Sequence, residues 1–123
     1  MRLALLAIAL MFAGCAGETG TPEQDAVGTV ATFLAQCARD RPLNAMAELV
    51  PGAQRDFLAA GGTVAGCART LRVGGLAPGA FAAARPRLRS FTGQHAVVLV
   101  GIAGRDVPLE LTYGEGYWRI EGA

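Results

Sequence analysis

Lysine is missing from this chain of 123 residues, and all eleven basic residues are arginine. No lysine can therefore form a Schiff base with a substrate or act as the cation of a phosphate-binding loop. Histidine is almost missing as well, because His95 is alone and leaves too few ligands for a zinc site. We expect neither a metal nor a cofactor.

Long apolar runs and an excess of one charge are also lacking. Beyond residue 13, no apolar run approaches the roughly 20 residues of a membrane-spanning helix. The eleven arginines are nearly balanced in number by ten acidic residues. We therefore expect no basic surface that would bind nucleic acid. The length suits a single domain.

The first residues predict export. Met1 and Arg2 form a short positive segment, and the apolar run from Leu3 to Ala13 has the length of a secretory signal peptide. Such a run is too short to span a bilayer as a helix. The rest of the chain is therefore expected outside the cytosol.

The end of this run, Phe12 to Cys15, resembles the lipobox of bacterial lipoproteins, with phenylalanine where leucine is usual. The resemblance implies that a signal peptide, residues 1–14, is removed and that Cys15 is alkylated with diacylglycerol. Residues 15–21 would then form a lipid anchor and its tether in the cell envelope, since two acyl chains give lasting membrane attachment. Secretion without a lipid, after cleavage behind Ala16, is the alternative.

Two further cysteines, Cys37 and Cys67, lie in the remaining chain. In an oxidising compartment an even pair most simply forms a disulfide. Closing a loop of 30 residues stabilises a fold by roughly 3 to 4 kcal/mol in the chain-entropy model. A redox pair is disfavoured because the two do not form a Cys-x-x-Cys motif.

Helices are predicted first. Thr21 and Pro22 are a helix start, and apolar residues at helical spacing predict a buried face up to about Asp40: Val27, Val30, Ala31, Leu34, Cys37 and Ala38. A shorter helix is expected over 43–50, then a turn or two with Phe57 and Leu58 buried. A third helix, capped by Thr63, should bury Cys67.

Strands are predicted afterwards. The pattern has period two over 88–91, 95–102, 107–113 and 117–121, with glycine-containing turns between the runs, as in antiparallel hairpins. In the run over 95–102, both sets of alternating positions are apolar, so this strand should lie in the middle of the sheet. The segment before these strands reads as a loop with one helical turn around Phe81. The fold class is therefore α+β, with about three helices on one face of a curved antiparallel sheet of about four strands.

This order of elements resembles the nuclear transport factor 2-like superfamily, over about residues 22–123. The segments that carry the resemblance are "AVGTVATFLAQCARD", "PGAQRDFLAA", the third helix with its cysteine, and "LELTYGEGYWRIEGA". The resemblance implies a single cone-shaped domain. It also associates the chain with isomerases and dehydratases that carry an Asp, His or Tyr set inside the cone.

Few residues suit acid–base catalysis. His95 follows a hairpin turn, Asp106 lies beside another, and Glu110 alternates with leucines that should face inward, so all three are expected at the surface. No catalytic residue is assigned. Arg85, Arg87 and Arg89 are expected along a solvated edge strand, with anion binding as the alternative.

Aromatic residues are the candidates to line a pocket: Phe33, Tyr113 and Trp118. Cross-strand pairing of the aromatic residues at the last hairpin, and burial of Phe33 in the core, are the structural alternatives. We expect a non-enzymatic, membrane-tethered domain that binds a small apolar ligand or an envelope protein. An isomerase- or dehydratase-like enzyme, or a structural domain whose sheet face pairs with a partner or a second copy, are the alternatives.

Overall fold

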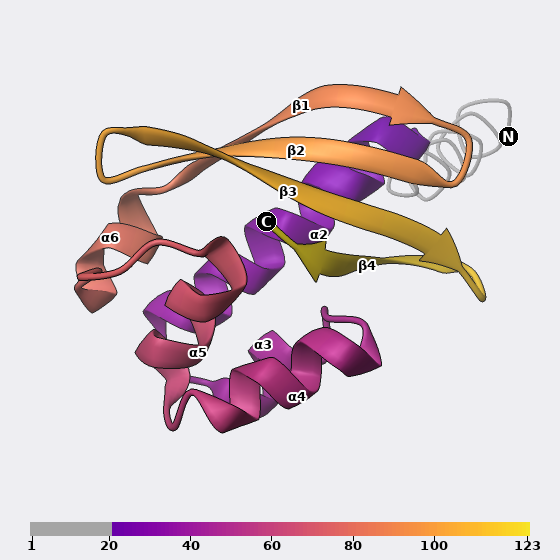
Figure 1. Cartoon of the computed structure of the whole chain (residues 1–123). Helices are drawn as coiled ribbons and strands as arrows, with labels where there is room; N and C mark the ends of the chain where they lie inside the picture. Colours follow the sequence, from indigo (N-terminus) through magenta and orange to yellow (C-terminus); the bar gives the residue numbers. More distant parts are fainter. Residues whose placement is uncertain (1–20) are drawn as a thin grey trace, which may run out of the picture.

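A computed structural model describes residues 21–123, so the predicted signal peptide and Cys15 lie outside the described residues. Helices come first and a sheet follows (Figure 1). The helices are α2 (Pro22–Ala38), α3 (Pro42–Met46), α4 (Pro51–Ala59), α5 (Thr63–Leu71) and α6 (Pro78–Ala83). The strands are β1 (Arg85–Thr92), β2 (His95–Ile102), β3 (Arg105–Gly114) and β4 (Tyr117–Gly122). The predicted α+β class is confirmed.

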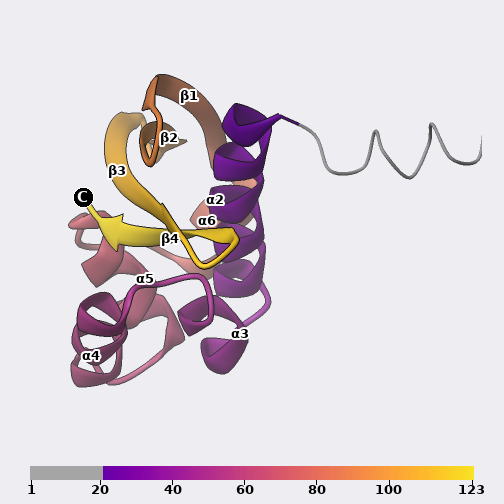
Figure 2. The ribbon, with the colours of Figure 1, turned by 90° about the vertical axis from the view of Figure 1, so that its right-hand side faces the viewer.

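The sheet is an antiparallel meander in the order β1-β2-β3-β4, so the predicted central position of β2 is confirmed. One face is buried along alternate residues, with Val98 of β2 opposite Leu109 of β3 and Ala96 opposite Leu111. The other face carries exposed or half-buried side chains. Figure 2 shows α2 running along one side of the sheet, with α3, α4 and α5 grouped below β4.

Helix α2 begins where the sequence predicts. The Thr21 hydroxyl accepts from the Gln24 amide at 3.2 Å, and the Gln24 side chain accepts from the Thr21 amide at 3.1 Å, which satisfies two of the free N–H groups of the first turn. The buried face, however, is turned from the predicted one, because α2 contacts helices as well as the sheet. Ala31 is exposed, whereas Phe33 is completely buried.

The predicted disulfide between Cys37 and Cys67 is confirmed. It joins α2 to α5, with both cysteines fully buried and their Cα atoms 6.2 Å apart. The cap of α5 differs from the prediction, because the Gly66 amide donates to the carbonyl of Gly62 at 2.7 Å. Gly62 is therefore the cap residue, and Thr63 is a buried residue of the first turn.

The helix predicted over 43–50 ends at Met46, because the following backbone pairs with the sheet instead. The Ile120 amide of β4 donates to the Glu48 carbonyl at 2.8 Å, and the Val50 amide donates to the Ile120 carbonyl at 3.0 Å. Leu58 was predicted to be buried, and this is wrong. It is 64% exposed, since Phe57 takes the inward position of α4.

Candidate functional site

Aromatic side chains meet at the last hairpin. Tyr113 of β3 lies directly opposite Trp118 of β4, and their ring centroids are 5.3 Å apart at an interplanar angle of 62°. Phe91 of β1 meets the Trp118 ring edge-on at 6.0 Å. The predicted cross-strand pairing is confirmed. Trp118 is 3% exposed and Tyr113 is 40% exposed, so the cluster reaches from the core to the surface.

Two adjoining hollows open beside these rings, and both are lined by Asp25, Tyr113 and Trp118. We call them together the aromatic hollow. The smaller part, about 220 Å³, is completed by Pro22, Phe91 and Gly93. The larger part, about 370 Å³, lies between α2 and the β3–β4 hairpin and is completed by Gln24, Gly28, Thr29, Thr32, Glu48, Gly116 and Tyr117.

Both ionisable carboxyl residues of the aromatic hollow come from the helical half of the chain. Asp25 belongs to the first turn of α2, and Glu48 is held beside β4 by the backbone hydrogen bond from Ile120. Partial burial raises the pKa of the Glu48 carboxyl above its ordinary value of 4.5, because a charged carboxylate loses hydration there. The residues that line the hollow include no arginine and no histidine.

Trp118 also brings an unmet hydrogen-bond donor. Its indole Nε1 is buried, and no acceptor lies within hydrogen-bond distance among the described residues. A buried N–H without a partner is costly, about 1–3 kcal/mol. The hydrogen-bonding capacity of this N–H is therefore unused among the described residues.

Not every predicted pocket residue reaches this site. Phe33 is completely buried in the core and lines neither part of the aromatic hollow. Conversely, Asp25 and Glu48 were not singled out from the sequence. Glu48 comes near Trp118 only through the pairing of residues 48–50 with β4, which has no local sequence signal.

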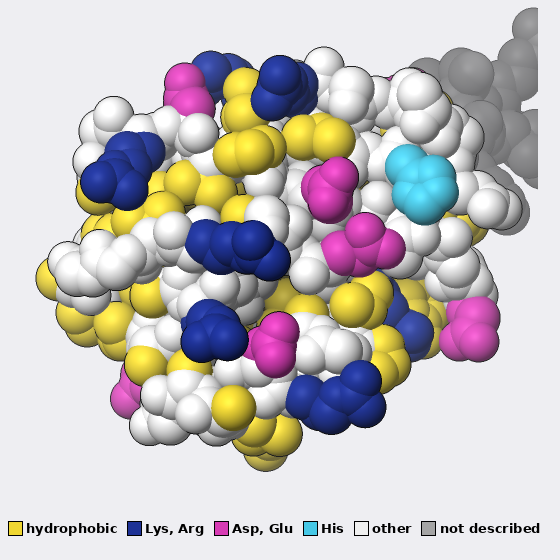
Figure 3. Space-filling view, in the orientation of Figure 1, with side chains coloured by type: hydrophobic (Ala, Val, Ile, Leu, Met, Phe, Trp, Pro, Cys, Tyr) yellow, Lys and Arg dark blue, Asp and Glu magenta, His cyan; other side chains and the backbone are white. Residues whose placement is uncertain are grey.

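The residues weighed for catalysis lie elsewhere. His95, Asp106 and Glu110 are all exposed, as the sequence predicts, and none lines the aromatic hollow. Asp106 forms an ion pair with Arg87 at 3.1 Å, with both side chains more than half exposed. The face seen in Figure 3 carries arginine and acidic side chains interspersed with apolar patches. Neither sign of charge dominates this face.

The arginines of β1 lie on an edge strand, as predicted. A groove of about 530 Å³ between α2 and α6 is lined by Arg39 and Arg85, and its lining is otherwise rich in alanine. Nη1 of Arg85 donates to the carbonyls of Ala84 at 3.0 Å and Ala83 at 3.2 Å. Arg85 therefore caps the end of α6, which argues against the anion-binding alternative at this residue.

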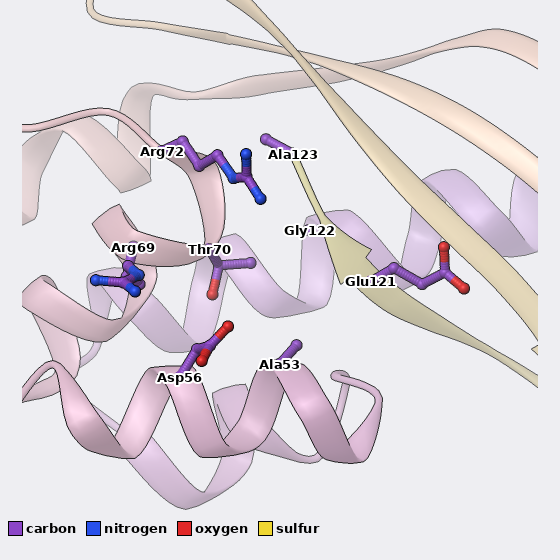
Figure 4. A pocket seen from close by; sticks show the side chains of 8 residues that line it. All are labelled: Ala53, Asp56, Arg69, Thr70, Arg72, Glu121, Gly122 and Ala123. Atoms are coloured by element: carbon purple, nitrogen blue, oxygen red, sulfur yellow. The ribbon is translucent and has the colours of Figure 1, made fainter.

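A more polar hollow, of about 400 Å³, lies between α4, α5 and the end of β4 (Figure 4). Asp56 rises from α4 toward Thr70, and Arg72 reaches from the end of α5 toward Ala123. The Thr70 hydroxyl donates to the Gly66 carbonyl at 3.0 Å, so it is already paired. Charges of both signs with large exposure make this hollow a less specific site.

Within residues 21–123, no three histidine, cysteine or acidic side chains gather closely enough to hold a metal ion. None of the helices described is both long and apolar enough to cross a bilayer.

Comparisons of the chain with protein-family models, with curated proteins and with solved structures found no match.

Proposed function

We propose that this chain is an exported, membrane-tethered domain that binds a small ligand in the aromatic hollow without transforming it. The observation that carries the proposal is the hollow itself, in which the rings of Phe91, Tyr113 and Trp118 surround a concave space. Apolar contact there would supply about 25 cal/mol per Å² of ligand surface buried, before ordering costs. Such a site fits small ligands with an apolar part.

Export is supported by the disulfide between Cys37 and Cys67, since such bridges persist in oxidising compartments. The lipobox-like segment that ends at Cys15 supports a lipid anchor. Only six residue steps separate Cys15 from Thr21, a span of at most about 22 Å, and Pro22 itself lines the hollow. An anchored chain would thus keep the aromatic hollow close to the membrane.

We also propose that the domain belongs to the nuclear transport factor 2-like fold. The order of helices before a four-strand meander supports this. So does the closing strand with Trp118, Arg119 and Ile120.

One observation favours the enzymatic alternative. Glu48 lies in the hollow with a pKa raised by burial, and carboxyl groups of that kind serve as general acids or bases. We place the enzyme second because no other side chain of the hollow forms a hydrogen bond with the Glu48 carboxyl among the described residues.

Native mass spectrometry of the chain purified from its own cells tests the proposal. We expect an additional small mass that is lost when Tyr113, a partly exposed wall residue, is replaced by alanine. A bound molecule recovered unchanged after long incubation supports binding, and a chemically altered one supports the enzyme. A chain that carries no small molecule and retains none from a metabolite extract contradicts both.

A further inference from the structure

The ionisable groups that line the aromatic hollow have one sign. Asp25 and Glu48 carry carboxyl groups, and the lining includes no arginine or histidine, although the whole chain has nearly equal numbers of acidic and basic residues. Neither carboxyl group forms an ion pair among the described residues. Among the described residues, the carboxyl groups of Asp25 and Glu48 therefore have no cation paired with them.

The nearest arginine on the hairpin is already engaged. The guanidinium of Arg119 lies over the Tyr117 ring, 4.6 Å from its centroid, and donates to the Tyr117 hydroxyl at 2.7 Å. Arg119 is next to Trp118 in β4, so their side chains point to opposite faces of the sheet. Arg119 therefore covers the Tyr117 ring, and its side chain lies on the opposite face of β4 from Trp118.

Aromatic rings beside carboxylates are an arrangement that recognises organic cations. The negative face of a ring attracts an ammonium group, and the attraction increases when water is excluded. We propose that the aromatic hollow binds an organic ammonium group against the partly exposed ring of Tyr113, beside the buried Trp118, with Asp25 and Glu48 balancing its charge. This inference rests on the proposed function and names the chemical class of its ligand.

Choline carries a quaternary ammonium group, the type of cation that aromatic sites bind by cation–π attraction, and is the simplest probe.

Trp118 makes the test direct, because it is the one tryptophan of the chain. The full chain with Cys15→Ser is titrated with choline chloride and with 3,3-dimethylbutan-1-ol, its uncharged isostere, at constant ionic strength, and indole fluorescence is recorded. Cation–π attraction predicts that choline binds about threefold to thirtyfold more tightly than the alcohol. Equal affinity would overturn the inference and leave the proposed function in place. No response to either compound also overturns the inference, and native mass spectrometry then decides the proposed function separately.

Variants that neutralise one carboxylate each test whether the preference for choline arises in the aromatic hollow. Glu48→Gln and Asp25→Asn should each reduce the preference for choline over the alcohol by at least threefold, while affinity for the alcohol stays the same. Glu110→Gln is the matched control, because it removes one carboxylate from the exposed face of β3, away from the hollow. If the preference survives in both hollow variants, the cation binds elsewhere and the inference is wrong.

A free solute and a lipid headgroup can present the same ammonium group. Co-sedimentation of the Cys15→Ser chain with phosphatidylcholine vesicles, but not with phosphatidylglycerol vesicles, identifies the headgroup as the source. Binding of choline without either vesicle identifies a free solute. Equal binding to both vesicles contradicts a cation-selective site.

Discussion

Replacement of Gly66 by alanine tests how closely α4 and α5 pack. A Cβ atom at Gly66 would lie 2.7 Å from two carbons of the Phe57 ring and 2.8 Å from a third, whereas carbon atoms normally approach to about 3.5–4.0 Å. Phe57 is 2% exposed, so its ring cannot turn into solvent. The two helices must therefore move apart.

Two opposing effects set the size of the change. Alanine is better than glycine inside a helix by about 1 kcal/mol, whereas overpacking of a core costs about 1–3 kcal/mol. Gly66 is followed by Cys67, whose disulfide to α2 restricts any shift of α5, so the upper part of that range applies. The net loss of stability is about 1–2 kcal/mol, which lowers Tm by about 5–15 °C in a domain of this size.

Thermal and urea unfolding, followed by circular dichroism on the oxidised Cys15→Ser chain, measures the loss. Gly28→Ala is the matched control, because a Cβ atom there meets no described atom within 4 Å apart from the adjoining backbone of its own helix. It should gain up to about 1 kcal/mol. Adding Phe57→Leu to Gly66→Ala should recover part of the loss. If Gly66→Ala melted as high as Gly28→Ala, the close contact between the helices would be refuted.

Three further predictions concern the bridge, the anchor and Glu48. Replacing Cys37 and Cys67 together by alanine should lower the unfolding free energy by roughly 3 kcal/mol or more, measured in urea; thiols that react with iodoacetamide in the native chain would contradict the bridge. Cys15→Ser should move the chain from the detergent phase to the aqueous phase in Triton X-114, and unchanged partitioning would exclude the anchor. Because burial raises the Glu48 pKa above 4.5, its charged form destabilises the fold as pH rises through that pKa. Glu48→Gln should therefore raise Tm at pH 7 and lose this advantage below pH 4.5. A gain in Tm that grows on acidification would contradict the upward direction of the Glu48 pKa shift.

The strands were the most predictable part of the fold. Their period-two pattern and their glycine turns are local signals, and β2 is found over the predicted range, His95–Ile102. The disulfide was predictable too, because Cys37 and Cys67 each fall on the inward side of their own helix. The strand prediction depends on residues close together in sequence. The disulfide prediction depends on the fact that two cysteines remain after Cys15.

What could not be predicted depends on contacts between distant elements. The buried face of α2 is turned toward Phe33 because the helix packs against the sheet and against α6 together, and a single hydrophobic stripe does not describe such a helix. The position of Glu48 depends on its pairing with Ile120, 72 residues later. The place of Glu48 in the candidate site could therefore not be predicted from the sequence, whereas Tyr113 and Trp118 could be.

The short pairing of residues 48–50 with β4 also affects how copies of this domain could associate. Ile120, in the middle of β4, uses both its N–H and its C=O on Glu48 and Val50, so that margin of the sheet cannot accept an incoming strand there. Among the described residues, β1 forms the other margin of the sheet and pairs with β2 alone. Growth of a fibril by strand addition requires two open margins, one for each neighbour, so the pairing at Ile120 hinders such growth at the β4 margin.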